Sequence, residues 1–198
     1  MIEFNNLSKE IPYLIFKDRY EKSIIAKQKN VEAVCIASYS SKTNETNARF
    51  VNLKFINNKE FIFFSNYGSP KSIEFTLNDQ IAAIFFWNEI NTQIRIKASI
   101  KKTSRKFNEL YFAQREKKKN ALAISSNQSK KISSYNKLLK NYEKSLLEDN
   151  LSICPEHWGG FSFIPYYFEF WEGHEFRLNK RDVYEYHNEE WKHSYLQP

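Results

Sequence analysis

The chain has little glycine and little cysteine: four glycines and two cysteines among 198 residues. Rossmann and Walker phosphate-binding loops need several glycines clustered before a helix, so this scarcity excludes both. Cys35 and Cys154 lie far apart, and the four histidines form no His-Glu-x-x-His pattern. No serine or cysteine is placed as in a catalytic triad. We therefore expect no metal site, and any chemistry would need a borrowed organic cofactor.

Long hydrophobic runs are also missing. No segment approaches the roughly 20 apolar residues that span a bilayer, and the polar first ten residues are unlike a signal peptide. We expect a cytoplasmic protein in a reducing compartment, with no membrane partner. Hydrophobic residues nevertheless make up 41% of the chain and aromatic residues 17%, which is enough for a core. Without repeats or flexible linkers, residues 1–198 are expected to form a single domain.

Acidic residues are scarce in one stretch. Residues 101–140 hold twelve basic and two acidic residues, a net charge of +10, whereas the whole chain carries +7. Such a segment attracts anions, which leaves three interpretations: nucleic acid, a phosphorylated small molecule, or a solvated lysine-rich surface. It contains no helix-turn-helix, RNP or zinc-finger pattern, so we expect no nucleic-acid partner.

Strand patterns dominate the chain. Residues 93–100 alternate strictly, with Ile94, Ile96, Ala98 and Ile100 expected to face inward. Further strands are predicted at 31–38, 49–56, 61–65, 81–87, 160–164, 166–171 and 183–186. Helices are predicted at 12–27, 104–114 and 133–148. Many strands with few helices between them predict a mainly β, α+β fold, either an antiparallel barrel or a sandwich with peripheral helices.

Several basic residues could bind an anion. Ser69 and Pro70 suit a helix start, where Lys71 and free amides favour a phosphate, although the same residues also suit an ordinary capped helix. Arg49 and Lys54 bracket one predicted strand. Lys54 is expected on the face opposite Val51, Leu53 and Phe55, which would point it into a cleft or into water.

Two other groups of residues suit ligand binding. Tyr111 and Arg115 lie four apart on a predicted helix, so they share a face that could hold a phosphate or cover the core edge. Trp171, Arg177 and Arg181 combine an aromatic ring with two guanidinium groups, a set suited to a flat anionic ring system.

These segments together resemble the pyridoxine/pyridoxamine 5′-phosphate oxidase family over about residues 12–198. The matching segments occur in the family's order: Arg49–Lys54, Phe63–Lys71, Gln93, Tyr111-Phe112 with Arg115, Gln128-Ser129, His157–Phe161, Glu169–Gly173, Arg177-Leu178 with Arg181, and Leu196–Pro198. The resemblance implies a split β-barrel homodimer that binds two FMN molecules at the subunit interface.

The resemblance also implies roles for individual residues. FMN would be held by Arg49, Phe50, Val51, Asn52, Leu53, Lys54, Phe64, Ser65, Lys71, Gln93, Gln128, Ser129, Trp171 and Arg181. A small phosphorylated pyridine substrate would be held by Lys54, Tyr111, Arg115, Lys119, Arg177 and Asn179, with Arg177 and Asn179 as the catalytic pair. The family passes a hydride from the substrate C4′ to flavin N5, which yields pyridoxal 5′-phosphate as product, and oxygen then reoxidises the flavin to give hydrogen peroxide.

Four positions depart from the family pattern. Pro70 replaces an arginine, Lys119 replaces a serine, and Asn179-Lys180 replace a His-Asp pair. Asparagine can form hydrogen bonds but cannot titrate near neutral pH as histidine does. The alternatives are therefore a paralogous FMN-dependent oxidoreductase acting on another small molecule, or a non-catalytic flavin- or nucleic-acid-binding protein.

Overall fold

A nine-stranded sheet organises the computed structural model, which describes residues 1–198. The strand order is β1-β3-β2-β5-β6-β7-β8-β9, and β4 pairs with both β3 and β7. Strands β2, β3, β4, β7, β6 and β5 therefore close into a barrel, and all of their mutual pairings are antiparallel. The strands are β1 (Glu3–Asn5), β2 (Ala33–Ser40), β3 (Glu45–Asn57), β4 (Glu60–Asn66), β5 (Gln80–Trp87), β6 (Thr92–Lys102), β7 (Trp158–Glu172), β8 (Lys180–His187) and β9 (Glu190–Tyr195).

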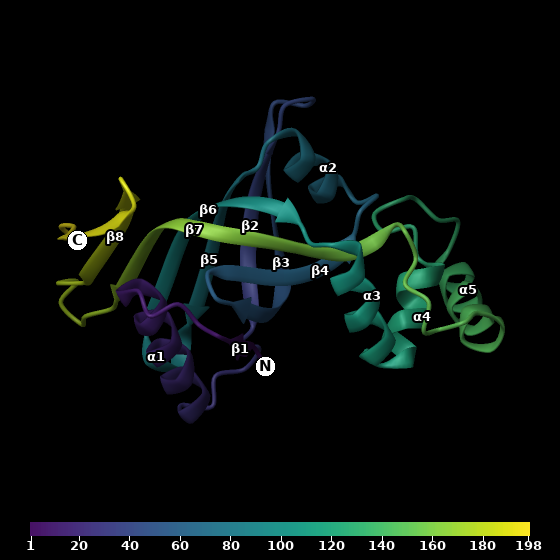
Figure 1. The fold of residues 1–198 in the computed structure, drawn as a ribbon, viewed down its shortest axis with the longest axis horizontal. Helices are drawn as coiled ribbons and strands as arrows, with labels where there is room; N and C mark the ends of the chain where they lie inside the picture. The colour runs from purple at the N-terminus through teal and green to yellow at the C-terminus, as the bar shows by residue number, and fades with distance from the viewer.

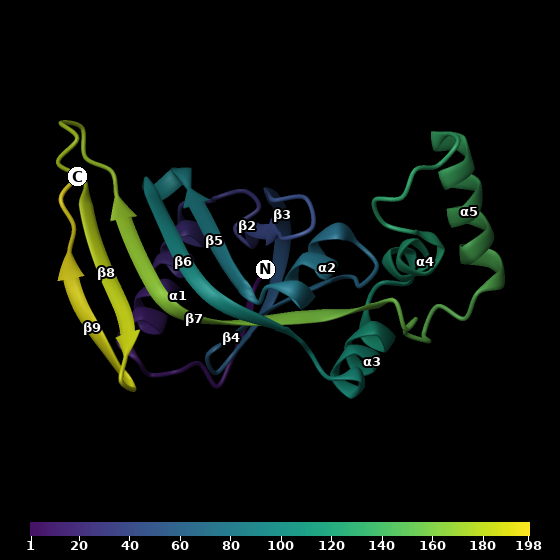
Figure 2. The same cartoon turned by 90° about the horizontal axis from the view of Figure 1, so that it is seen from above.

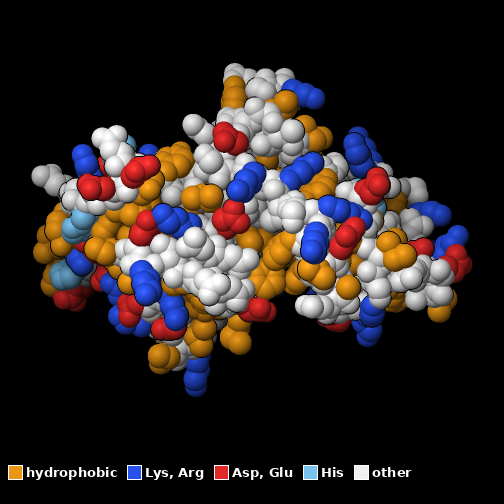
Figure 3. All heavy atoms as spheres, viewed as in Figure 1, with side chains coloured by type: hydrophobic (Ala, Val, Ile, Leu, Met, Phe, Trp, Pro, Cys, Tyr) orange, Lys and Arg blue, Asp and Glu red, His pale blue; other side chains and the backbone are white.

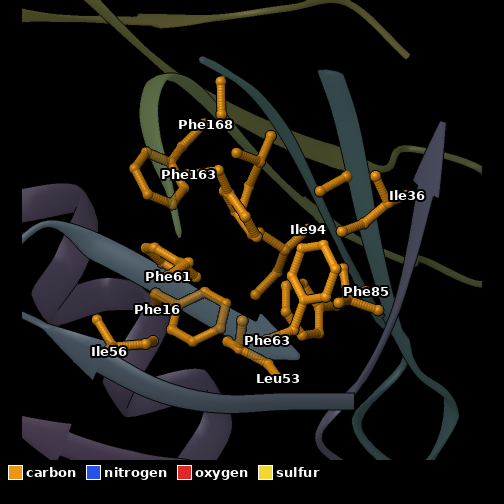
Figure 4. Packing of buried hydrophobic residues seen from close by; sticks show 14 of the residues in the cluster. Phe16, Ile36, Leu53, Ile56, Phe61, Phe63, Phe85, Ile94, Phe163 and Phe168 are labelled. Atoms are coloured by element: carbon orange, nitrogen blue, oxygen red, sulfur yellow. The ribbon is translucent and has the colours of Figure 1, made fainter. Parts of the chain in front are cut away.

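Aromatic side chains fill the barrel. Phe61, Phe63, Phe163 and Phe168 are fully buried and pack against one another, as Figure 4 shows. Helix α1 (Ile11–Ile25) begins with a proline in its first turn and adds Phe16 to the same cluster. Burial of so many large rings supplies the main stabilisation of the fold. The mainly β fold with peripheral helices is thus confirmed.

Strand β7, with 15 residues, is the longest strand of the sheet. It pairs with β4 near its start, with β6 along most of its length, and with β8 near its end (Figure 2). Sequence patterns predict two strands here, separated at Pro165, but the strand is continuous. The register shifts between Lys97 and Ala98 on β6, beside the pairing of Ala98 with Pro165. A proline is tolerated at such an irregularity in a ladder.

The helices lie around the barrel and at one end of the molecule. Helix α2 (Pro70–Leu77) follows β4, whereas α3 (Arg105–Gln114), α4 (Lys117–Ser125) and α5 (Tyr135–Glu148) gather at the end opposite β8 and β9 (Figures 1 and 2). The 3-10 turn η1 (Asn88–Ile90) joins β5 to β6. Helix α4 was not predicted, because its lysine-rich start hides a short buried face formed by Asn120 and Ala121. None of the helices is both long and apolar enough to span a bilayer.

A bulge in β3 changes which side chains face the core. The pairing with β4 shifts between Leu53 and Phe55, so Leu53 and Ile56 are buried in the core. The predicted inward position of Phe55 is wrong. Its ring instead packs on Phe64 and Tyr111. Bulges of this kind redirect side chains next to functional sites.

Candidate functional site

A cavity of about 490 Å³ opens beside β3, at the side of the barrel nearest the helical end. Its walls come from β3, the end of β4, the start of α2, the end of α3 and the loop after α4. The lining residues are Arg49, Phe50, Val51, Asn52, Lys54, Phe64, Ser65, Pro70, Lys71, Tyr111, Arg115, Gln128 and Ser129. This volume lies within the range of small-molecule sites.

The position of β3 explains why consecutive residues reach the cavity. Residues 49–52 pair with β2 along one edge, whereas β1 and β4 join β3 only from Leu53 onward. The other edge of this stretch has no strand beside it and faces the cavity. Lys54 lies at the bulge, which brings its side chain to the same space. An open strand edge offers backbone amides and carbonyls to a ligand.

Positive charge distinguishes the cavity. Four basic side chains line it, from Arg49, Lys54, Lys71 and Arg115, and no carboxylate does. In the space-filling view, basic side chains also stand over the α3–α5 end, among acidic and apolar ones (Figure 3). A concave surface lined by one sign of charge favours an oppositely charged ligand. The cavity therefore suits an anion.

Lys71 is the most buried of these cations, with 7% of its surface exposed. Its Nζ donates to Ser69 Oγ at 3.1 Å and to Gln128 Oε1 at 3.4 Å. Burial, together with the charge of Arg49, lowers the pKa of Lys71 to about 8. An anion bound here would stabilise the charged form of this poorly solvated lysine.

Ser69 occupies the N-cap position of α2, as predicted, but does not cap the helix with its side chain. Its hydroxyl donates to the Asn66 carbonyl at 2.8 Å and accepts from Lys71. Pro70 has no N–H, and the Ser72 amide donates to the Ser69 carbonyl at 3.0 Å, so the Lys71 amide is the free donor of the first turn. The backbone amide and the side chain of Lys71 point to the same kind of ligand, a phosphate or another anion.

The Arg49 guanidinium is fixed by polar partners on β2 and α2. Its Nη1 donates to Ser38 Oγ at 2.6 Å, and its Nη2 lies 3.2 Å from Glu74 Oε2. Glu74 is buried and also accepts hydrogen bonds from Ser38 and Asn47. This network fixes the guanidinium between β2, β3 and α2.

Aromatic rings form the wall at the far end of the cavity. Phe64 and Tyr111 stack with centroids 4.0 Å apart, and Phe64 also stacks on Trp158 at 5.0 Å. Burial raises the pKa of Tyr111, so its hydroxyl stays protonated and available as a donor. Tyr111 and Arg115 line the cavity together, as their four-residue spacing suggests.

The structure brings most of the predicted site residues together, with clear exceptions. Leu53 faces the barrel core, because of the alternation along β3, and its side chain does not reach the cavity. Lys119 lines a smaller neighbouring cavity that shares Arg115 and Gln128. Five other predicted residues line neither of these two cavities; they are Gln93, Trp171, Arg177, Asn179 and Arg181.

Strand register shows how far these residues are from the cavity. Gln93 pairs with Trp171, and Trp171 with Arg181, so the three form one row across β6, β7 and β8. Trp158, near the cavity, begins β7, and Trp171 comes thirteen residues later, roughly 40 Å along an extended strand. None of the three lines the cavity of its own chain.

Arg177 and Asn179 lie in the loop between β7 and β8. Arg177 is exposed and has a left-handed backbone, with a φ of 62°. Asn179 Oδ1 accepts a hydrogen bond from the His174 amide at 3.0 Å, which closes the loop. Asn179 therefore has a local structural partner in addition to its predicted role toward a ligand.

Two residues that shape the site were not predicted. Glu74 pairs with Arg49, and Asn120 contacts Arg115. The sequence carries no signal for either pairing, because each joins elements distant in the chain or in an unpredicted helix. A buried carboxylate or amide is recognised only once its partners are located.

Known proteins match this chain in both sequence and fold. Residues 158–198 match the pyridoxine 5′-phosphate oxidase C-terminal dimerisation region. A pyridoxine/pyridoxamine 5′-phosphate oxidase from Hydrogenovibrio crunogenus is 35% identical over 175 residues, 88% of this chain and 81% of that protein. One from Trichormus variabilis is 34% identical over 190 residues, 94% and 88% of the two chains.

Solved structures share the fold. PhzG from Burkholderia lata, in complex with tetrahydrophenazine-1-carboxylic acid, has a TM-score of 0.89 at 23% identity, over 94% of this chain and 92% of that one. A pyridoxamine 5′-phosphate oxidase-related, FMN-binding protein from Nostoc punctiforme has a TM-score of 0.79 at 9% identity, over 96% and 99%. The solved structures share the fold, and the sequence matches show the family: the chain belongs to the pyridoxine/pyridoxamine 5′-phosphate oxidase family.

Proposed function

We propose that this protein is an FMN-dependent oxidase that converts pyridoxine 5′-phosphate or pyridoxamine 5′-phosphate to pyridoxal 5′-phosphate, with oxygen as electron acceptor. The observation that carries the proposal is the cavity itself, which has four cations, no carboxylate and an aromatic wall. Arg49 and Lys71 lie beside α2, Arg115 ends α3, and Lys54 lines the same space from β3. Two phosphate-bearing molecules, cofactor and substrate, would share these cations.

The residues present fit FMN. Its phosphate would be bound by Lys71 and Arg49 near the start of α2, with polar contacts from Ser65 and Gln128. The open edge of β3, from Phe50 to Asn52, would lie beside the flat ring system, with Phe64 near by. Bound FMN supplies the two-electron acceptor for the substrate C4′ carbon.

The substrate phosphate would be bound by the other two cations. Lys54 and Arg115 provide the charge there, and the protonated Tyr111 hydroxyl provides a donor. Lys119 is close enough to line the adjoining space, so it would add charge at the entrance. These residues would orient the substrate and fix its distance from the flavin.

A second copy of the chain would complete the site. Phe50, Cys35 and Ile84 form a row on the outer face of β3, β2 and β5, and Phe86 lies beside it, paired with Gln93. Phe50 and Phe86 are 74% and 55% exposed, so this face of the sheet presents two large aromatic side chains to solvent in a single chain. A homodimer would cover this face and supply Gln93, Trp171 and Arg181 of the partner subunit to the flavin. Arg177 and Asn179 of the partner subunit would then face the substrate.

A paralogous oxidoreductase of the same fold is the second candidate. The observation that favours it is Asn179, which is hydrogen-bonded to its own loop and replaces a titratable residue of the family. Asn179→His distinguishes the two candidates. It should raise turnover of pyridoxine 5′-phosphate in a B6 oxidase, and leave it unchanged if the pocket serves another ligand.

Reconstitution tests the proposal. Apo-protein titrated with FMN should acquire a stoichiometric flavin spectrum. The loaded protein should then form pyridoxal 5′-phosphate and hydrogen peroxide in equal amounts from pyridoxamine 5′-phosphate, and much more slowly from pyridoxamine. Flavin binding without product from either phosphate ester would favour the paralogue. No flavin binding at all would contradict both candidates.

A further inference from the structure

Arg115 is restrained from three directions at the end of α3. Its Nη1 donates to the Lys119 carbonyl at 2.8 Å and to Asn120 Oδ1 at 3.1 Å. Its guanidinium carbon lies 5.1 Å from the ring centroid of Trp158, within range of a cation–π contact. These contacts use one of its nitrogens, so Nε and Nη2 remain as donors for a ligand in the cavity that Arg115 lines.

Asn120 is the residue that orients this guanidinium. It is 0% exposed, and its Nδ2 donates to the Phe112 and Leu151 carbonyls, each at 2.8 Å. Two carbonyl acceptors fix which end of the amide is nitrogen, so Oδ1 must face Arg115. The three contacts use both N–H donors and the carbonyl oxygen of Asn120, and they fix the orientation of its side chain.

The partners of Asn120 belong to separate parts of the helical end. Phe112 is on α3, Asn120 on α4, and Leu151 follows α5. Ser145 Oγ on α5 also donates to the Ala121 carbonyl, at 3.2 Å, which joins α5 to α4. The orientation of Arg115 therefore depends on α4 and α5, which do not themselves line the cavity.

We infer that Asn120 is a positioning residue that holds Arg115 in the geometry needed to bind the substrate phosphate. A free arginine side chain loses considerable rotamer entropy when it binds an anion. Asn120 and Trp158 restrict Arg115 before binding, so less entropy is lost with the ligand. This inference rests on the proposed function, because it takes Arg115 as the receptor for a substrate phosphate.

A double-mutant cycle on the FMN-loaded protein tests the inference. The probes are 4-deoxypyridoxine 5′-phosphate, which has no C4′ hydroxyl to oxidise, and 4-deoxypyridoxine, which lacks the phosphate. Asn120→Ala should weaken binding of the phosphate ester about tenfold and change binding of the free alcohol less than twofold. In an Arg115→Ala background, Asn120→Ala should have less than a twofold effect on either probe.

Asn108→Ala is the matched control. Asn108 is also a buried asparagine of this end, and its three partners are Thr103, Tyr67 and the Gly160 amide, none of them a cation of the cavity. It should lower stability without changing the preference for the phosphate ester. If Asn120→Ala yields no folded protein, Asn120→Ser enters the same cycle. Its hydroxyl can donate to one carbonyl, but is too short to reach Arg115.

The outcomes separate the two claims. Equal losses for both probes, or a tenfold loss that persists in the Arg115→Ala background, would show that Asn120 acts only on general structure and would overturn the inference. An unmodified FMN-loaded protein that does not prefer the phosphate ester would overturn the proposed function and the inference with it. An unmodified protein that prefers the ester, with a cycle that shows coupling, supports both.

Discussion

The Arg49 guanidinium and the Glu74 carboxylate form an ion pair between β3 and α2, with Nη2 and Oε2 3.2 Å apart. Glu74 is buried, and Arg49 lines the cavity with its remaining surface. The pair therefore attaches the start of the proposed phosphate site to the barrel wall.

Glu74→Ala should lower the free energy of unfolding by about 2–3 kcal/mol, below the about 3–5 kcal/mol for fully buried pairs, because Arg49 keeps some solvent contact. Urea unfolding at matched protein concentration measures the effect. The control is Glu45→Ala. Glu45 is an exposed acidic residue on β3, the strand of Arg49, and its removal should change stability by less than about 0.5 kcal/mol. Similar losses in the two variants would contradict the role assigned to the pair.

Lys71→Ala should weaken FMN binding by about 1.5–3 kcal/mol, the range for a hydrogen bond to a charged group. Pro70 provides no charge beside it, so Lys71 and Arg49 must neutralise the phosphate without an additional arginine. Fluorescence titration of apo-protein with FMN gives the affinity. Lys130→Ala, which removes an exposed lysine outside the cavity lining, should leave it unchanged. Unchanged FMN affinity in Lys71→Ala would place the phosphate elsewhere.

FMN binding should weaken as pH rises from 7 to 9.5. Burial lowers the pKa of Lys71 to about 8, so the ligand-free protein loses this positive charge within that interval. The FMN phosphate stays dianionic throughout, since its second pKa is about 6. Lys71→Arg keeps a charge at every pH of the series and should abolish most of the decline. A decline of equal size in that variant would assign the titration to another group.

Phe86→Asp should separate the subunits. Phe86 lies on the outer face of β5 beside Gln93, and a carboxylate buried there on association would have no partner. Sedimentation velocity should show a monomer, and FMN affinity should fall at least tenfold because the partner's residues are missing. Leu147→Asp alters an exposed apolar residue on α5, away from the β3–β2–β5 face, and should remain dimeric. A monomeric Phe86→Asp protein with normal FMN affinity would show that one chain suffices for the site.

Local patterns predicted the elements in which apolar and polar residues alternate regularly. The alternation of Ile94, Ile96, Ala98 and Ile100 reproduces the buried face of β6, because one side of that strand faces the barrel core. Strand β9 was missed, because its outer position leaves Glu190–Tyr195 mostly exposed and without alternation. The bulge at Lys54 could not be predicted either, since it depends on the pairing of β3 with β4.

The sequence indicated which residues belong to the site better than it indicated where they lie. The family pattern indicated Lys71, Tyr111 and Arg115, and the structure brings these three to one cavity. It could not show that Trp171 and Arg181 lie at the opposite end of the molecule, because that separation follows from the length of β7. The buried partners Glu74 and Asn120 become recognisable only in three dimensions.

The most direct test of the central claim is anaerobic reduction of the bound flavin. FMN-loaded protein is mixed with pyridoxine 5′-phosphate or pyridoxamine 5′-phosphate under argon, and the flavin absorbance is followed. The proposed oxidase should bleach with at least one of these esters, recover its colour when oxygen is admitted, and bleach far more slowly with the unphosphorylated vitamers. A flavin that binds fully but is bleached by neither ester would contradict the assignment to vitamin B6 phosphates.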